Sequence, residues 1–135
     1  MSLEQNKALV RRYVEDVHNK GNLAVVDEVI GPRFVALSQA GPWELGPAEM
    51  KQFVAQRRTA IPDFRATIDE MIAEGDKVVV RGHDEGTQMG EYMGFAPSGK
   101  TFNISWIDIF RIENGQIVEM WWEMSMDTLR KQLTG

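Results

Sequence analysis

The spacing of apolar residues in the first half of the chain predicts three helices and one short strand. In each helix, apolar side chains recur every three or four positions, so that one face can be buried. Glycine or proline, which end helices, stands after each of these segments. We expect helices ending at Gly21, between Asn22 and Ile30, and between Pro47 and Pro62, and a strand over 34–37.

From Phe64 onward the pattern changes to alternating apolar and polar residues, which is typical of strands. The predicted strands lie near 64–73, 77–89, 101–112 and 117–124, and a short helix follows near 126–133. Helices followed by long strands indicate a single α+β domain over 1–135, with a curved antiparallel sheet and helices on its concave face. Such a sheet leaves a cone-shaped cavity, where ligand sites are favoured.

One acidic residue stands in the middle of an apolar predicted strand. Asp108 shares a strand face with Trp106 and Phe110, because alternate side chains point the same way. A carboxylate among aromatic rings loses hydration, which raises its pKa and makes it a usable acid or base near neutral pH. We therefore predict a catalytic role for Asp108. The alternative is a structural carboxylate held by a tyrosine, tryptophan or backbone donor.

The turn between the last two strands determines which residues surround Asp108. A two-residue turn at Asn114-Gly115 places Trp121 opposite Asp108, whereas a three-residue loop from Glu113 places Met120 there. We favour the three-residue loop, because it separates a core face from an outer face. The core face then carries Asp108 and five residues that are predicted either to bind a flat, hydrophobic ligand or to pack as core: Trp106, Phe110, Met120, Trp122 and Met124.

The two histidines support different interpretations. His18 ends the first predicted helix, where an imidazolium would interact favourably with the helix dipole. A catalytic alternative is that His18 hydrogen-bonds a ligand, or Asp108, across the cavity. His83 alternates with Arg81 and Glu85, which indicates a solvated or interface face. Histidines this far apart give no metal-ligand spacing and no triad, so we expect no metal or cofactor.

Composition restricts the partners and the location. The net charge of −5 argues against nucleic acid and against an anionic membrane, because both require basic patches. The polar N-terminus does not resemble a signal sequence, and no apolar run approaches membrane length, so we expect a cytoplasmic protein. Ile107, Ile109 and Trp121 fall on the outer face of the predicted sheet, which predicts a homodimer through that face.

Three segments resemble the SnoaL-like polyketide cyclases of the NTF2-like superfamily. They are the opening at 6–12 and 19–23, the segment 86–100 with its Gly90-Glu91 pair and Pro97-Ser98-Gly99 turn, and the hairpin 109–119. The resemblance implies an NTF2-like cone that dimerises through the outer face of the sheet. It also implies ring closure by aldol condensation without metal or cofactor, carried out by an aspartate on the last strand and a histidine on the preceding strand.

The catalytic pair of the family does not transfer unchanged. Its histidine position falls on Asp108 and its aspartate position on Trp122. Either the acid has moved one strand over, or the activity has changed. Our first hypothesis is an enzyme in which Asp108 takes a proton next to a carbonyl group of a small hydrophobic compound, for cyclisation, isomerisation or dehydration. The second is a binding or accessory protein that has lost the catalytic aspartate.

Overall fold

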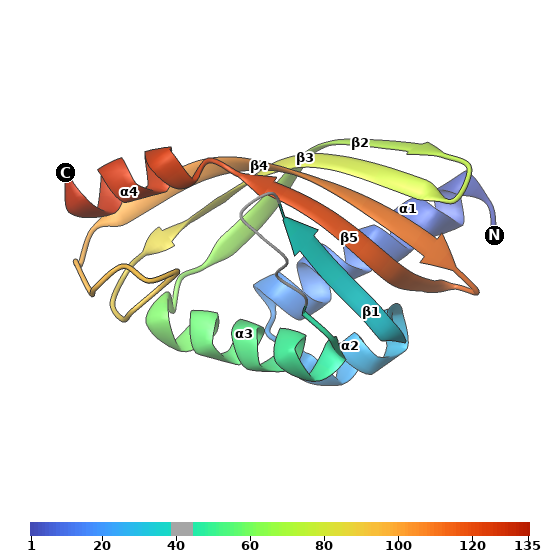
Figure 1. Cartoon of the computed structure of the whole chain (residues 1–135), viewed down its shortest axis with the longest axis horizontal. Coiled ribbons are helices and arrows are strands. Elements are labelled where there is room, and N and C mark those ends of the chain that lie inside the picture. The colour runs from blue at the N-terminus through green and yellow to red at the C-terminus, as the bar shows by residue number, and fades with distance from the viewer. Residues whose placement is uncertain (39–44) are drawn as a thin grey trace.

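The computed structural model describes residues 1–38 and 45–135, in which five strands form one curved sheet with helices below it (Figure 1). The helices are α1 (Leu3–Arg12), the π-helix η1 (Tyr13–Asn19), α2 (Leu23–Val29), α3 (Pro47–Ala60) and α4 (Met126–Thr134). The strands are β1 (Ile30–Ser38), β2 (Arg65–Glu74), β3 (Lys77–Thr87), β4 (Thr101–Glu113) and β5 (Gln116–Met124).

The sheet has the order β1-β5-β4-β3-β2. Strands β2 to β5 form an antiparallel meander, and β1 adds an edge strand parallel to β5. The predicted α+β fold is confirmed. The strand β1 begins at Ile30, earlier than expected, because Ile30 already has extended backbone angles and an edge strand tolerates Pro32.

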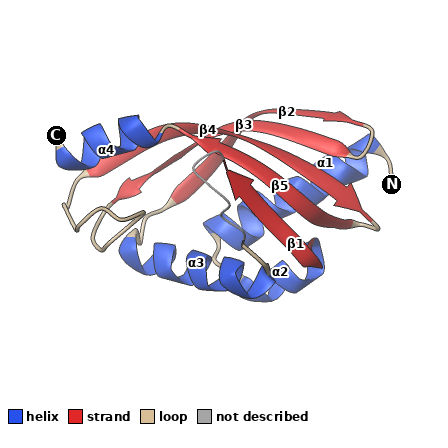
Figure 2. Cartoon of the chain, viewed as in Figure 1, coloured by secondary structure: helices blue, strands red, loops and turns tan. Residues whose placement is uncertain are grey.

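The helices α1, η1, α2 and α3 cover the concave face of the sheet (Figure 2). The helix α4 packs against the start of β4, where Gln132 is hydrogen-bonded to Asn103. The core lies between these two layers, and Val17, Val54, Val80 and Phe110 are completely buried there. Within the described part of the chain, no helix is long and apolar enough to cross a membrane.

The hairpin between β4 and β5 differs from the predicted register. Asn114 and Gly115 both have positive φ, at 53° and 75°, and form a two-residue turn that pairs Glu113 with Gln116. An irregularity next to Arg111 then shifts the register, so that Asp108 pairs with Trp122. The predicted three-residue loop was wrong. This irregularity adds one residue and so returns Trp122 to the same face of the sheet as Asp108. The predicted longer loop would have had the same effect, because a bulge and a longer turn both reverse the alternation of side chains.

The first helix changes its hydrogen bonding at Tyr13. A capping box between Ser2 and Gln5 begins α1, and η1 continues the helix as a π-helix to Asn19. In an α-helix, Tyr13 and His18 would point about 140° apart, since each residue turns about 100°. Hydrogen bonds from i to i+5 widen the turn and bring residues five apart onto the same side. The two rings are 4.5 Å apart, edge to face.

Candidate active site

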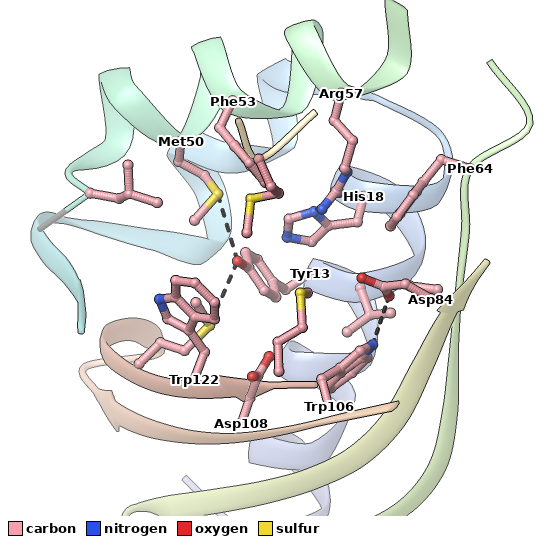
Figure 3. A pocket seen from close by; sticks show the side chains of 16 residues that line it. Tyr13, His18, Met50, Phe53, Arg57, Phe64, Asp84, Trp106, Asp108 and Trp122 are labelled. Atoms are coloured by element: carbon pink, nitrogen blue, oxygen red, sulfur yellow. Dashed lines mark hydrogen bonds between the residues drawn. The ribbon is translucent and has the colours of Figure 1, made fainter. Parts of the chain in front are cut away.

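A cavity of about 90 Å³ lies between the helices and the concave face of the sheet. The sheet contributes Asp84, Trp106, Asp108, Met120, Trp122 and Met124. The helices contribute Tyr13, Val14, His18, Met50, Phe53 and Arg57. Figure 3 shows Met50, Phe53 and Arg57 reaching the cavity from α3 above. Trp106, Asp108 and Trp122 reach it from β4 and β5 below. The walls are mostly apolar, so the few ionisable groups act on one another through a medium of low dielectric constant.

Asp108 points from β4 into this cavity (Figure 3). In the described part of the chain, no group donates a hydrogen bond to its carboxyl. Burial raises the pKa of Asp108 well above its usual value, and the charge of Asp84 raises it further. Asp108 therefore keeps its proton to higher pH than an ordinary aspartate, and in its protonated form it can give a proton or a hydrogen bond to a ligand.

A second carboxyl, Asp84, lies on β3 and is only 4% exposed. The indole Nε1–H of Trp106 donates a hydrogen bond of 2.7 Å to Asp84 Oδ1. Burial raises the pKa of Asp84 to about 6, although the charge of Arg57 and the indole N–H both favour the carboxylate. Asp84 is thus mostly ionised at neutral pH, and its charge is one cause of the raised pKa of Asp108.

Gly82 allows Trp106 to reach Asp84. Gly82 pairs with Trp106 across β3 and β4, and the indole ring lies over it. A Cβ atom at position 82 would lie 2.6 Å from Cζ2 of Trp106 and 2.4 Å from the carbonyl oxygen of Thr67. Because real Cβ atoms do not approach so closely, any larger residue would displace the ring that fixes Asp84.

Arg57 is the only cationic side chain among the described residues that line the cavity, and it is 5% exposed. Its guanidinium carbon lies 3.7 Å from the centre of the Phe64 ring and 5.0 Å from that of Phe53. Its Nη2 donates a hydrogen bond to Nδ1 of His18. Its Nε is buried without a partner among the described residues.

The contact with Arg57 determines the state of His18. A guanidinium can only donate, so Nδ1 of His18 accepts and Nε2 carries the proton of the neutral ring. Burial, followed by the charge of Arg57, lowers the pKa of His18 well below its usual value. His18 is consequently neutral, and our interpretation of it as an imidazolium at a helix end was wrong. Its ring lines the cavity.

Tyr13 completes the polar lining. Its hydroxyl lies 3.7 Å from the sulfur of Met50 and 3.9 Å from that of Met120. Thioether sulfurs are weak acceptors, so these contacts hold the hydroxyl loosely. Burial raises the pKa of Tyr13, and the nearby Asp108 raises it further. Tyr13 remains a neutral hydrogen-bond donor beside the cavity.

The structure brings most of the predicted site residues together. Asp108, His18, Trp106, Met120, Trp122 and Met124 all line the cavity. Phe110 does not, because it is completely buried beneath Tyr13, with the ring centres 5.6 Å apart. Among the described residues, no group of three or more side chains could hold a metal ion.

Sequence analysis missed Asp84 and Arg57, although both follow a visible pattern. Asp84 continues the inward positions of Val78, Val80 and Gly82 along β3. Its neighbours on the chain, His83 and Glu85, are polar, which makes the end of β3 resemble a solvated strand. Arg57 lies seven residues after Met50, on the buried face of α3. In both cases the position in the pattern of buried residues indicates burial, whereas a charged residue type is usually exposed.

The chain belongs to the SnoaL-like polyketide cyclase family, whose model matches residues 8–133. A comparison with curated proteins gives no match. Among solved structures, TsrD from Streptomyces laurentii has 28% identity and a TM-score of 0.88, and the match covers 99% of this chain and 98% of that chain. IdmH from Streptomyces antibioticus, named as a candidate polyketide cyclase, has 26% identity and a TM-score of 0.83, with 97% and 99% covered.

A third similar structure carries a different description. AclR from Streptomyces galilaeus, named as a candidate hydroxylase, has 26% identity and a TM-score of 0.83, with 98% of this chain and 86% of that chain covered. One fold is thus described with two reaction types among similar proteins. The reaction must therefore be argued from the residues of the cavity.

Proposed function

We propose that this protein is a cofactor-independent enzyme that acts by acid/base catalysis on a small, hydrophobic carbonyl compound, as a polyketide cyclase does. The observation that carries the proposal is the carboxyl of Asp108, which faces an apolar cavity and receives no hydrogen bond from the described residues. The carboxyl is half-buried and reachable from the cavity, so a ligand there can supply the hydrogen-bond partner that the described residues do not. A carbonyl oxygen of the substrate is such a partner.

The raised pKa of Asp108 changes the role that its sequence position suggested. A protonated carboxyl cannot begin by removing a proton from carbon, as we expected from the sequence. It can instead donate its proton to a carbonyl oxygen as the enol forms. The neutral ring of His18, whose Nε2 carries a proton, and the hydroxyl of Tyr13 supply further donors for that oxygen.

The shape and lining of the cavity define the substrate class. The volume of about 90 Å³ is below the roughly 300–1,000 Å³ of pockets for drug-sized ligands, which favours a compact molecule. Trp106, Trp122 and the methionines provide flat and adaptable apolar surfaces. Cyclisation, isomerisation and dehydration all begin with enolisation, and this site supports each of them.

A second candidate function is the binding of a small hydrophobic ligand without catalysis. The observation that favours it is Trp122, which lines the cavity opposite Asp108 where the family has its catalytic aspartate. An indole cannot exchange protons with a substrate as a carboxyl does. The two candidates differ in whether the proton of Asp108 is transferred to the ligand or only shared with it.

A thermal-shift screen of small cyclic, polycyclic and terpenoid ketones tests the proposal. It is run on the wild type, on Asp108→Asn, and on Asp69→Asn as a matched control on the outer face. Ligand at a hundred times its dissociation constant stabilises the folded state by about 2.7 kcal/mol. Hits are then incubated with each protein, and products are measured by mass spectrometry.

Two outcomes separate the candidates. The enzyme predicts a product with the wild type and with Asp69→Asn, and none with Asp108→Asn, which still binds because an amide can also donate a hydrogen bond. The binding protein predicts hits that stabilise all three proteins equally and are recovered unchanged. The second outcome would overturn the proposed catalysis.

A further inference from the structure

We propose that Asp84 is the general base of this site and removes the proton from the carbon next to the substrate carbonyl. This inference rests on the proposed function, because it supplies the base that a protonated Asp108 cannot be. Asp84 has no such role in the family pattern that the sequence suggested, in which the histidine and aspartate positions correspond to Asp108 and Trp122.

The surroundings of Asp84 suit a base. Oδ1 accepts the indole N–H of Trp106, which fixes the plane of the carboxylate. Within the described residues, no donor binds Oδ2, and Asp84 lines the cavity. A carboxylate held at one oxygen and open at the other is oriented and still able to take a proton.

Trp106 separates the two carboxyls. Asp84 lies on β3, Trp106 and Asp108 lie on β4, and the indole of Trp106 reaches back across Gly82 to Asp84. Figure 3 shows both carboxyls facing the same space, with the indole between them. A flat ketone stacked on the indole would place its carbonyl oxygen toward one carboxyl and its adjacent carbon toward the other.

Charged and titratable groups of several described elements act on Asp84 or respond to its charge. Arg57 of α3 and His83 of the same strand favour the carboxylate. Asp108 and Tyr92 are each affected by the charge of Asp84, and burial raises the pKa of Tyr92 to about 12. His18 and Tyr13 of η1 line the same cavity and are neutral. Arg57 is therefore the main counter-charge, yet the structure shows no direct ion pair between Arg57 and Asp84, so the carboxylate stays available.

The proton transfers balance. Asp84 takes the proton from carbon, the C–H electron pair becomes the carbon–carbon double bond of the enol, and the carbonyl oxygen takes the proton of Asp108. In a cyclisation, the enol carbon then adds to a second carbonyl carbon and forms a new carbon–carbon bond. Asp84 gives its proton to the oxygen of that second carbonyl, and the enol proton returns to Asp108. Both carboxyls regain their starting states without an oxidant or a co-reactant.

Hydrogen–deuterium exchange of 2-tetralone in D₂O, followed by NMR, tests the inference, because it reports proton removal without requiring a full reaction. The wild-type rate should rise with pH through about 6, as Asp84 ionises. Asp84→Asn, which keeps an oxygen for the indole N–H, should lose at least about 100-fold of the exchange rate at all pH values. Asp69→Asn removes a carboxylate that is bonded to His83 on the outer face, and this variant should exchange 2-tetralone at the wild-type rate.

A second variant keeps the inference testable if Asp84→Asn does not fold. Trp106→Phe removes the indole donor, which raises the pKa of Asp84. The rise of the exchange rate with pH, called here the acid limb, should therefore move to higher pH. A purely structural role for Asp84 would lower the amount of folded protein and leave the position of that limb unchanged. Binding of 2-naphthol, followed by tryptophan fluorescence, shows that each variant retains its cavity.

The outcomes separate the inference from the function on which it rests. Loss of exchange in Asp84→Asn together with a shifted limb in Trp106→Phe supports a base at Asp84. Exchange in Asp84→Asn within about threefold of the wild type overturns the base and leaves the proposed function standing. If the wild type exchanges neither 2-tetralone nor any ketone that binds in the screen, both the function and the inference are overturned.

Discussion

The two faces of the sheet use charge in opposite ways. On the concave face, Asp84 and Asp108 lie among aromatic rings, and burial raises both pKa values. On the outer face, carboxylates are paired and hydrated: Asp69 accepts a hydrogen bond from His83, and Glu70 lies 3.4 Å from Arg81. Outer pairs such as these contribute little to stability, whereas buried charges dominate the chemistry around them.

The strand β4 shows this contrast most clearly, because its pattern of apolar and polar residues is inverted around Asp108. Asp108 points inward, while Ile107 and Ile109 point outward and are 47% and 39% exposed. A strand that only supported the fold would have the isoleucines inside and the aspartate in water. We propose that both faces bind something: a polar ligand group inside, and an apolar surface outside.

The largest expected effect comes from removing the inner acid. Asp108→Asn should lower kcat/KM by about 10²- to 10⁴-fold, the usual range for one acid/base group. The wild-type rate should form a bell in pH, rising as Asp84 ionises near 6 and falling once Asp108 loses its proton at higher pH. Steady-state rates between pH 5 and 10 check both limbs. An unchanged high-pH limb in Asp108→Asn would assign that limb to another group.

The second effect concerns stability and has an unusual sign. The pKa of Asp84 is about 6 in the folded protein, above the usual 3.8, so the folded state holds the proton more tightly than the unfolded chain. The free energy of unfolding should therefore fall as pH rises from about 4 to 6, and Asp108 extends the fall to higher pH. Asp84→Asn removes the contribution of Asp84, and should be more stable than the wild type at pH 8 by about 3 kcal/mol.

Urea unfolding at pH 4 and pH 8 measures this difference, at one protein concentration. The two proteins should have similar stability at pH 4, where Asp84 is protonated in the folded state, and diverge at pH 8. A variant less stable than the wild type at pH 8 would show that the carboxylate of Asp84 stabilises the fold. Such an outcome would weaken the distinction between the two faces, because the inner charge would then behave like the outer ones.

The same contrast explains what the sequence could predict. The alternation along β4 and β5 correctly placed Asp108 and Trp122 on the inner face, because a period of two is local. The exact pairing was wrong, because a bulge next to Arg111 shifts the register and no distinctive residue marks it. The π-helix was missed for a related reason. Apolar spacing does not distinguish i+4 from i+5 hydrogen bonding, so the contact of Tyr13 with His18 was not foreseen.

The burial of Arg57 and Asp84 could not be predicted from their residue types. Arg57 and Asp84 are charged and lie in charged segments, so their types indicate solvent. Their burial depends on contacts made across the fold: Phe64 against the guanidinium, and Trp106 against the carboxylate. Sequence pattern gives the direction in which a side chain points, and only the packed structure shows what covers it.

The third effect addresses the outer face. We propose that the protein forms a homodimer through this face, where Ile107, Ile109 and Trp121 are exposed. Ile109→Lys should weaken the dimer at least about tenfold, equivalent to about 1.4 kcal/mol, because a charge would be buried in an apolar interface. Light scattering over a dilution series measures the change. A wild type that is monomeric at all concentrations would contradict the proposed interface.

The smallest effect completes the comparison. Asp69→Asn removes a carboxylate that is bonded to His83 at 2.8 Å on the outer face. The free energy of unfolding should change by less than about 1 kcal/mol, because water replaces most of what the partner supplied. The same type of substitution at Asp84, on the neighbouring strand but the opposite face, should change it at least about three times as much and with the opposite sign. Urea unfolding of both variants at pH 8 measures the ratio, and similar effects of the two substitutions would mean that burial does not distinguish the two faces.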